Sequence, residues 1–310
     1  MTSEPARQVF PSGEQFEIVY GDQRATIVEV GGGIREYEVD GRPVLDPYPL
    51  DAMCDGAHGA VLVPWPNRLG DGRYDFDGTE QQVALSEPEK ENALHGLLRW
   101  RSWSPSERTI DRIVMSTTLH PMKGYPFCLR VDVAYQIDDA GLTVATTSTN
   151  AGAEPCPYGC GHHPYLSPGT GLIDDCKVEL EAGSRIATDD QRKLPTGVET
   201  VRGTRFDFSG GRRLGDDILD EPFTDLRRDD SGRAWVRLWG SDGRCVELWA
   251  DEHYPILELF TGDTLAADRR RNGLGTEPMT CPPNALQTGE HVVRLEPDQR
   301  ISTTWGVRLR

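Results

Sequence analysis

The chain has 310 residues, of which 50 are acidic and 33 are lysine or arginine, so its formal net charge is −17. This acidity, with an isoelectric point of about 4.8, disfavours nucleic acids and anionic membrane surfaces as partners, because like charges repel. Hydrophobic residues make up 37% of the chain, which suits a sizeable core, and no run approaches the roughly 18 apolar residues of a membrane span.

Alternation of apolar and polar residues recurs along the chain. In chain order, it is seen at residues 24–30, 131–138, 245–249 and 301–310. A period of two predicts β-strands that place one face on a core. Asp-Gly, Gly-Gly and similar steps separate these runs, and such steps suit tight hairpin turns.

Long helices have little room in this sequence, which contains 33 glycines and 22 prolines. Short helical turns are expected only near residues 49–54 and 281–288, because no convincing pattern with helical spacing is longer than about three turns. No linker, internal repeat or low-complexity segment stands out. The sequence therefore predicts an all-β fold, a large antiparallel β-sandwich formed by residues 1–310 as a single domain.

Seven cysteines are scattered along the chain, and an odd number in a large protein does not indicate a disulfide framework. The N-terminus lacks the apolar core of a signal peptide, so we expect a cytoplasmic protein with reduced thiols. Cys156 and Cys160 do not form a standard zinc pattern with His162 and His163. No dinucleotide loop, Walker A loop or serine-hydrolase elbow is found, and no metal or cofactor is expected.

His163 is the first candidate for acid–base chemistry. Pro164 follows it and restricts its backbone to extended geometry, so the imidazole is held in one direction. Imidazole can donate or accept a proton near neutral pH. Glu277 is the second candidate, because it precedes a proline in a proline-rich segment. A glutamate and a histidine in one cleft can supply a general base and a general acid.

Two other stretches contain candidate ligand-binding residues. Asn67 and Arg68 follow a run that prolines terminate, and they form a donor pair suited to a hydroxyl-rich or carboxylate ligand. A solvated surface turn is the alternative for this pair. His95 lies among apolar residues, where a histidine is more often a core residue than a catalyst.

Taken together, these stretches resemble the aldose 1-epimerase (mutarotase) family, from about residue 16 to residue 309. The segments that carry the resemblance, in family order, are Asn67-Arg68-Leu69, Leu94-His95-Gly96, His163-Pro164-Tyr165-Leu166, Asp220 to Leu226, and Glu277-Pro278. The resemblance implies the galactose mutarotase-like supersandwich fold. It also implies interconversion of the α and β anomers of a free aldohexose, such as glucose or galactose, by ring opening and closure without a cofactor or metal.

The resemblance further implies roles for individual residues in proton transfer. Glu277 resembles the general base and His163 the general acid. His95 resembles the second histidine, which binds the sugar near its ring oxygen or an adjacent hydroxyl.

Substrate-binding roles are implied in the same way. Arg68 and Asp225 resemble ligands of the sugar hydroxyls, and Asn67 is added to them. Trp65 is expected to offer a flat surface to the apolar face of the sugar, since an aromatic ring with a polar edge suits that task.

The segments after His163 and after Glu277 differ from those of well-known galactose mutarotases and are typical of a divergent bacterial branch. Three alternatives therefore stay open. The first is a hexose-6-phosphate mutarotase, in which Arg68, Arg73 and Arg99 are candidates for holding a phosphate. The second is a non-catalytic carbohydrate-binding module on the same scaffold, and the third is a metal-dependent sugar isomerase. The expected partner is a small-molecule sugar, and the expected state is a monomer or a weak homodimer.

Overall fold

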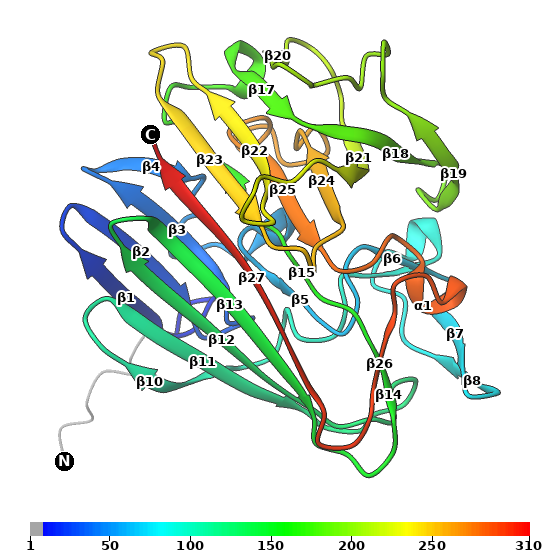
Figure 1. Ribbon diagram of the computed structural model, residues 1–310. Helices are drawn as coiled ribbons and strands as arrows, with labels where there is room; N and C mark the ends of the chain where they lie inside the picture. The colour runs from blue at the N-terminus through cyan, green and yellow to red at the C-terminus, as the bar shows by residue number, and fades with distance from the viewer. Residues whose placement is uncertain (1–8) are drawn as a thin grey trace, which may run out of the picture.

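The computed structural model describes residues 9–310, and their regular structure is almost entirely β-strand (Figure 1). The prediction of an all-β fold with large antiparallel sheets is confirmed. The larger sheet contains twelve strands. In spatial order they are β1 (Gln15–Tyr20), β2 (Gln23–Val28), β3 (Ile34–Val39), β4 (Arg42–Leu45), β16 (Tyr165–Leu166), β25 (Leu274–Met279), β24 (Ile256–Phe260), β21 (Asp220–Leu226), β18 (Ala182–Thr188) and β19 (Pro195–Thr200), with β15 (Gly161–His162) pairing β25 and β5 (Val61–Leu62) pairing β15.

The second sheet contains nine strands and packs against the first. Its spatial order is β10 (Ser104–Arg108), β11 (Arg112–Leu119), β12 (Leu129–Asp138), β13 (Gly141–Asn150), β27 (Arg300–Leu309), β23 (Cys245–Ala250), β22 (Ala234–Trp239), β17 (Lys177–Leu180) and β20 (Arg212–Arg213). In Figure 1 the red strand β27 runs between β13 and β23, so it lies in the interior of this sheet.

Three two-stranded ribbons and four short helical turns complete the described part of the chain. The ribbons are β6 (Arg68–Gly70) with β9 (Asn92–Leu94), β7 (Arg73–Phe76) with β8 (Thr79–Gln82), and β14 (Cys156–Tyr158) with β26 (Val293–Leu295). The helical turns are the 3-10 turns η1 (Asp55–Ala57), η2 (Pro88–Lys90) and η3 (Ile173–Asp175), and the α-helical turn α1 (Ala285–Thr288). In residues 9–310 no helix is long and apolar enough to cross a membrane.

Helix α1 confirms the helical turn expected near residues 281–288. The turn expected near residues 49–54 is displaced, because the helical residues there are those of η1. Strand β12 shows why the alternating pattern predicted strands correctly. Its residues alternate between buried and more exposed positions over its whole length, so one face contributes to the core and the other does not.

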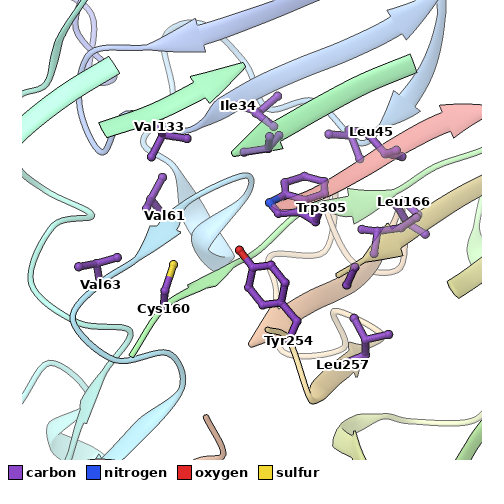
Figure 2. Packing of buried hydrophobic residues seen from close by; sticks show 14 of the residues in the cluster. Ile34, Leu45, Val61, Val63, Val133, Cys160, Leu166, Tyr254, Leu257 and Trp305 are labelled. Carbon is purple, nitrogen blue, oxygen red and sulfur yellow. The ribbon is translucent and has the colours of Figure 1, made fainter. Parts of the chain in front are cut away.

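The core lies between the two large sheets. Figure 2 shows Ile34 and Leu257 from the larger sheet, together with Val133 and Trp305 from the nine-stranded sheet, among the side chains of this layer. All four side chains are at most 3% exposed. Removal of such apolar surface from water stabilises the fold by about 25 cal/mol per Å².

Strand β25 differs from β12 because all six of its residues are buried. It lies between β16 and β24, and the sheet covers it on both edges. A strand that is buried on both faces does not need to alternate, and one of its faces can therefore hold polar groups away from water. Glu277 belongs to this strand.

Replacement of Leu257 by alanine tests the core. Leu257 is fully buried, and its truncation should leave a cavity that lowers the free energy of unfolding by about 2–5 kcal/mol. Leu172→Ala is the matched control, because Leu172 is 50% exposed and its truncation should cost about 0.5 kcal/mol or less. Urea unfolding of the two variants provides the comparison, and equal losses would contradict this assignment of the core.

Candidate active site

Backbone pairing brings His163 and Glu277 together. Gly161 of β15 pairs with Met279 of β25, and Tyr165 of β16 pairs with Gly275. In this antiparallel register, position 163 falls opposite position 277. The amide of Thr276 donates to the carbonyl of Pro164 at 2.8 Å, which holds the segment between β15 and β16 against β25.

The two side chains are in direct contact. His163 Nε2 lies 3.1 Å from Glu277 Oε1, and the two side chains are 5% and 2% exposed. His163 Nδ1 and Glu277 Oε2 are buried and have no hydrogen-bond partner among residues 9–310. Buried polar atoms are normally satisfied, so these two atoms are available to a ligand or to water.

Aromatic stacking fixes the plane of the His163 ring. The ring lies 4.9 Å from that of Tyr165, at an interplanar angle of 16°. Tyr165 is in turn stacked on His58, with ring centroids 3.8 Å apart, and its hydroxyl donates to the carbonyl of Gly56 at 2.6 Å. His58 therefore supports His163 through Tyr165.

His95 is held by a reciprocal pair of bonds with Asn67. The His95 amide donates to the Asn67 carbonyl at 2.9 Å, and the Asn67 amide donates to His95 Nδ1 at 3.1 Å. Both residues have positive φ, 61° and 55°, as single residues in tight turns do. Because Nδ1 accepts, a neutral His95 carries its proton on Nε2 and is a hydrogen-bond donor. Its ring lies edge-on to that of His163, with centroids 5.3 Å apart.

Arg68 forms one wall of the site together with two carboxylates. Its Nε lies 3.0 Å from Glu87 Oε2, and its Nη1 lies 3.4 Å from Asp220 Oδ2. Lys90 also binds Glu87, at 2.8 Å. These ion pairs compensate the positive charges of Arg68 and Lys90 within the protein.

Glu258 lies beside Glu277, because the two residues are directly paired between β24 and β25. Its Oε2 accepts a hydrogen bond from Asn67 Nδ2 at 2.6 Å. Burial, followed by the charges of Glu277 and Asp220, raises the pKa of Glu258 well above its ordinary value. We therefore expect Glu258 to be a neutral carboxylic acid at neutral pH.

These residues line one cavity of about 780 Å³, a volume typical of small-molecule sites. Of the residues expected from the sequence, five lie together in its wall: Asn67, Arg68, His95, His163 and Glu277.

Two expected site residues lie elsewhere. Asp225 is exposed and does not line the cavity. Asp220 lines the cavity instead, whereas Asp225, five residues further along β21, has a positive φ of 53° and an exposed side chain. Trp65 is 2% exposed and belongs to the hydrophobic core. Trp100, which is 52% exposed at the cavity wall, is the aromatic surface available to a ligand.

The sequence reasoning missed Asp220, Glu258 and Trp100 as site residues. Glu258 was detectable in principle, because it is the one charged residue in the otherwise apolar strand Ile256–Phe260, and a charge in a buried strand indicates a function. Asp220 was within the matched segment, but choosing it over Asp225 requires the register of β21. Trp100 gave no usable signal.

Burial acts in opposite directions on the two central groups. Burial, aided by the charge of Asp220, raises the pKa of Glu277 well above its ordinary 4.5. Burial, aided by the charges of His58 and Arg99, lowers the pKa of His163 well below its ordinary 6.5. A net charge of either sign on the His163–Glu277 pair is thus disfavoured. The pair should therefore hold one ionisable proton, on the carboxyl group or on the imidazolium, over a wide pH range.

His95, His163 and Glu277 could also hold a divalent metal ion. Each offers one ligand atom, and the three atoms lie within 4.8 Å of one another. Two histidines and one carboxylate form a known ligand set for transition metals. The same three groups can transfer and donate protons without a metal, so their geometry is compatible with both kinds of chemistry.

Comparison with known proteins identifies related chains. The sequence profile of the aldose 1-epimerases matches residues 15–308. The uncharacterized protein YihR of Escherichia coli is 32% identical over 292 residues, which are 92% of this chain and 90% of YihR. The aldose 1-epimerase of the same organism is 25% identical over 240 residues, 71% of this chain and 66% of that enzyme.

Solved structures show the same fold. A GalM/aldose epimerase homologue from C. elegans has a TM-score of 0.84 at 19% identity, covering 96% of this chain and 98% of that one. A galactose mutarotase-like protein from Clostridium acetobutylicum has a TM-score of 0.85 at 17% identity, with coverage of 98% and 97%. The galactose mutarotase-like supersandwich expected from the sequence is therefore confirmed.

The two aspartates of β21 provide a test of this site. Asp220→Asn removes a partner of Arg68 inside the cavity, and we expect it to weaken sugar binding about 10-fold or more. Asp225→Asn alters an exposed side chain outside the cavity and should change binding less than about twofold. Calorimetric titration of both variants with glucose and galactose compares them, and the reverse order of effects would contradict the assignment of Asp220.

Proposed function

Because the chain belongs to the aldose 1-epimerase family, we propose that it is an isomerase that interconverts the α and β anomers of a free aldohexose such as glucose or galactose. The observation that carries this proposal is the buried contact of 3.1 Å between His163 Nε2 and Glu277 Oε1. In a cyclic aldose the two oxygens that must exchange protons, the ring oxygen O5 and the C1 hydroxyl, are bonded to the same carbon. The acid and the base that serve them must therefore be neighbours.

Ring opening follows from these positions. Glu277 removes the proton of the C1 hydroxyl, and the C1–O5 bond breaks as C1 becomes an aldehyde carbon. The electron pair of that bond goes to O5, which takes the proton of His163. Rotation about C1–C2 presents the other face of the aldehyde, and closure with the two proton transfers reversed gives the other anomer.

The total number of protons on the pair does not change during the reaction. Before opening, one proton is on His163, and after opening one proton is on Glu277. Burial likewise favours one ionisable proton on the pair, and it favours Glu277 as the holder of that proton, so the reacting form requires the proton to pass to His163 first. General acid and general base catalysis contribute about 10²–10⁴-fold each, and no redox step is required.

Other residues of the cavity would orient the sugar. His95, with its proton on Nε2, would donate to the ring oxygen or an adjacent hydroxyl, and Arg68 and Asn67 would contact hydroxyls. Burial and the neighbouring cations, Arg99 first, lower the pKa of His95 well below its ordinary value, which keeps it neutral. Trp100 would cover the apolar face of the sugar in the role first expected for Trp65.

The alternative functions differ in the role, if any, that they require of His163 and Glu277. A non-catalytic carbohydrate-binding module requires neither an acid nor a base, and the contact between His163 and Glu277 favours catalysis over it. A metal-dependent isomerase would use His95, His163 and Glu277 as ligands, and its activity would fall on treatment with a chelator. A hexose-6-phosphate mutarotase would use the same chemistry on a charged substrate.

Loss of the base tests the mechanism. We expect Glu277→Gln to lower kcat by about 10²–10⁴-fold with a much smaller change in KM, because the amide cannot accept the proton of the C1 hydroxyl. Polarimetry of freshly dissolved α-D-glucose and α-D-galactose, with wild type, Glu277→Gln and His163→Ala, gives the rates. Glu290→Gln, an exposed glutamate, is the control that should keep wild-type activity.

Normal turnover by Glu277→Gln would remove this residue from the mechanism. Acceleration by wild type that disappears in His163→Ala would support His163 as the acid. Retention of activity after dialysis against a chelator would exclude the metal-dependent reading, and a wild-type protein that accelerates neither sugar would contradict the proposed reaction on these substrates.

The pH dependence of the reaction offers an independent test. If Glu277 and His163 titrated with their ordinary pKa values of 4.5 and 6.5, the pair would hold a single ionisable proton only in the narrow interval between those two pH values. Burial opposes a second proton, since it lowers the pKa of His163, and opposes loss of the last proton, since it raises the pKa of Glu277. We therefore expect kcat/KM to stay on a plateau well above pH 6.5, with its two limbs farther apart than those values. A bell confined between them would contradict this account.

A further inference from the structure

Arg99 is the cation in the cavity wall whose charge is not compensated by a neighbour. Three cationic side chains line the cavity: Arg68, Lys90 and Arg99. Arg68 and Lys90 are bound to carboxylates. Among residues 9–310, no carboxylate lies within 4.0 Å of the Arg99 guanidinium, and no side chain or backbone carbonyl accepts a hydrogen bond from it.

This arrangement is unusual for a guanidinium in a partly buried position. Arg99 lies against Trp100, with its guanidinium carbon 5.4 Å from the indole centroid, and its backbone is held near Gly31. Burial lowers the pKa of Arg99, and the more distant Cys54 and Glu277 act against this shift without bonding to the guanidinium. Arg228 is similarly removed from water, but it donates to four backbone carbonyls. Buried charges in proteins are normally paired, so Arg99 lacks a group that a ligand can supply.

We propose that Arg99 binds a singly charged oxyanion, a carboxylate or a sulfo group, carried by the sugar substrate at the C6 end of its ring. This inference rests on the proposed function, and it specifies the class of substrate. A guanidinium presents parallel N–H donors that match two oxygens of such a group.

The position of Arg99 selects the C6 end. Arg99 lines the same cavity as His163, His95 and Glu277. In the proposed reaction His163 protonates O5, which is bonded to C5, and C5 carries C6. A substituent at C6 is two bonds from O5, and we place it toward Arg99 because His163 and Arg99 line the same cavity.

The charge of the cavity selects a single negative charge over two. Apart from the neutral Glu258 and the His163–Glu277 pair, four carboxyl groups line it, Asp55, Glu87, Glu89 and Asp220, and they outnumber the three cations. One uncompensated guanidinium neutralises one charge. A phosphate monoester carries about −1.5 to −2 at neutral pH, so its second charge would meet an acidic wall without a partner. The hexose-6-phosphate alternative is thus disfavoured relative to a singly charged analogue.

Matched sugars separate these possibilities. We would compare glucose, glucose 6-sulfate, glucuronate and glucose 6-phosphate by NMR exchange spectroscopy of their anomeric protons, after subtraction of the uncatalysed rate. Glucose 6-sulfate and glucose 6-phosphate have the same shape and different charge. We expect kcat/KM for glucose 6-sulfate or glucuronate to exceed that for glucose about 10-fold or more, and that for glucose 6-phosphate to lie below both. Whichever of glucose 6-sulfate and glucuronate has the higher kcat/KM shows whether the site prefers a sulfo group or a carboxylate.

Variants of Arg99 assign the preference to this side chain. Arg99→Gln should reduce the ratio of kcat/KM for the preferred anion over glucose to about 1, and Arg99→Lys should keep part of it, because it keeps the charge and loses the parallel donors. Arg73→Gln is the control, since Arg73 is exposed and outside the cavity, and it should keep the wild-type ratio.

Each result decides the proposal. Equal values for glucose and both singly charged sugars, an unchanged ratio in Arg99→Gln, or a preference for glucose 6-phosphate would overturn it. If no sugar exchanges, glucose and galactose included, the proposed reaction fails. Calorimetric titration of wild type and Arg99→Gln with glucose 6-sulfate and glucuronate then still tests Arg99: binding that the variant loses supports the proposal, and no binding by wild type overturns it.

Discussion

The pairing of β25 with β15, β16 and β24 is the constraint on which the site depends. Because β25 is covered along both edges and on both faces, its register cannot slip without exposing the core. That register sets His163 opposite Glu277 on one side and Glu258 opposite Glu277 on the other. The site is therefore a row of polar side chains across neighbouring strands of a rigid sheet, and the loops contribute its walls, which include Trp100 and Arg99.

Exclusion of water gives this row its chemical character. In water, a carboxylate and an imidazole are separate groups with separate titrations. In the buried contact they behave as one unit that disfavours net charge, which favours the form that holds a single ionisable proton. The neutral Glu258 and the ion pairs of Arg68 keep the surrounding charges balanced. Arg99 is the exception, because no carboxylate is bound to it. We therefore relate its charge to a negative charge on the ligand and not to the stability of the fold.

The sequence predicted those features that local patterns determine. Alternation identified long strands such as β12, and family motifs identified His163, Glu277 and His95, which the structure places in one cavity. It failed where the three-dimensional register decides. Asp225 and Asp220 belong to the same motif, but only their places along the folded strand β21 show which one reaches the cavity. Trp65 and Trp100 look alike as residue types, yet tertiary packing buries the first in the core and leaves the second at the cavity wall.

The interior position of β27 also has a consequence for folding. This strand, residues Arg300–Leu309, bonds to β13 on one edge and to β23 on the other, so within the nine-stranded sheet these two strands are joined only through it. Until residues 300–309 leave the ribosome, both neighbours present open edges, which can pair with other chains. Contacts of such long sequence separation also slow folding. We therefore expect nascent chains of this protein to depend on protection by chaperones until synthesis reaches β27.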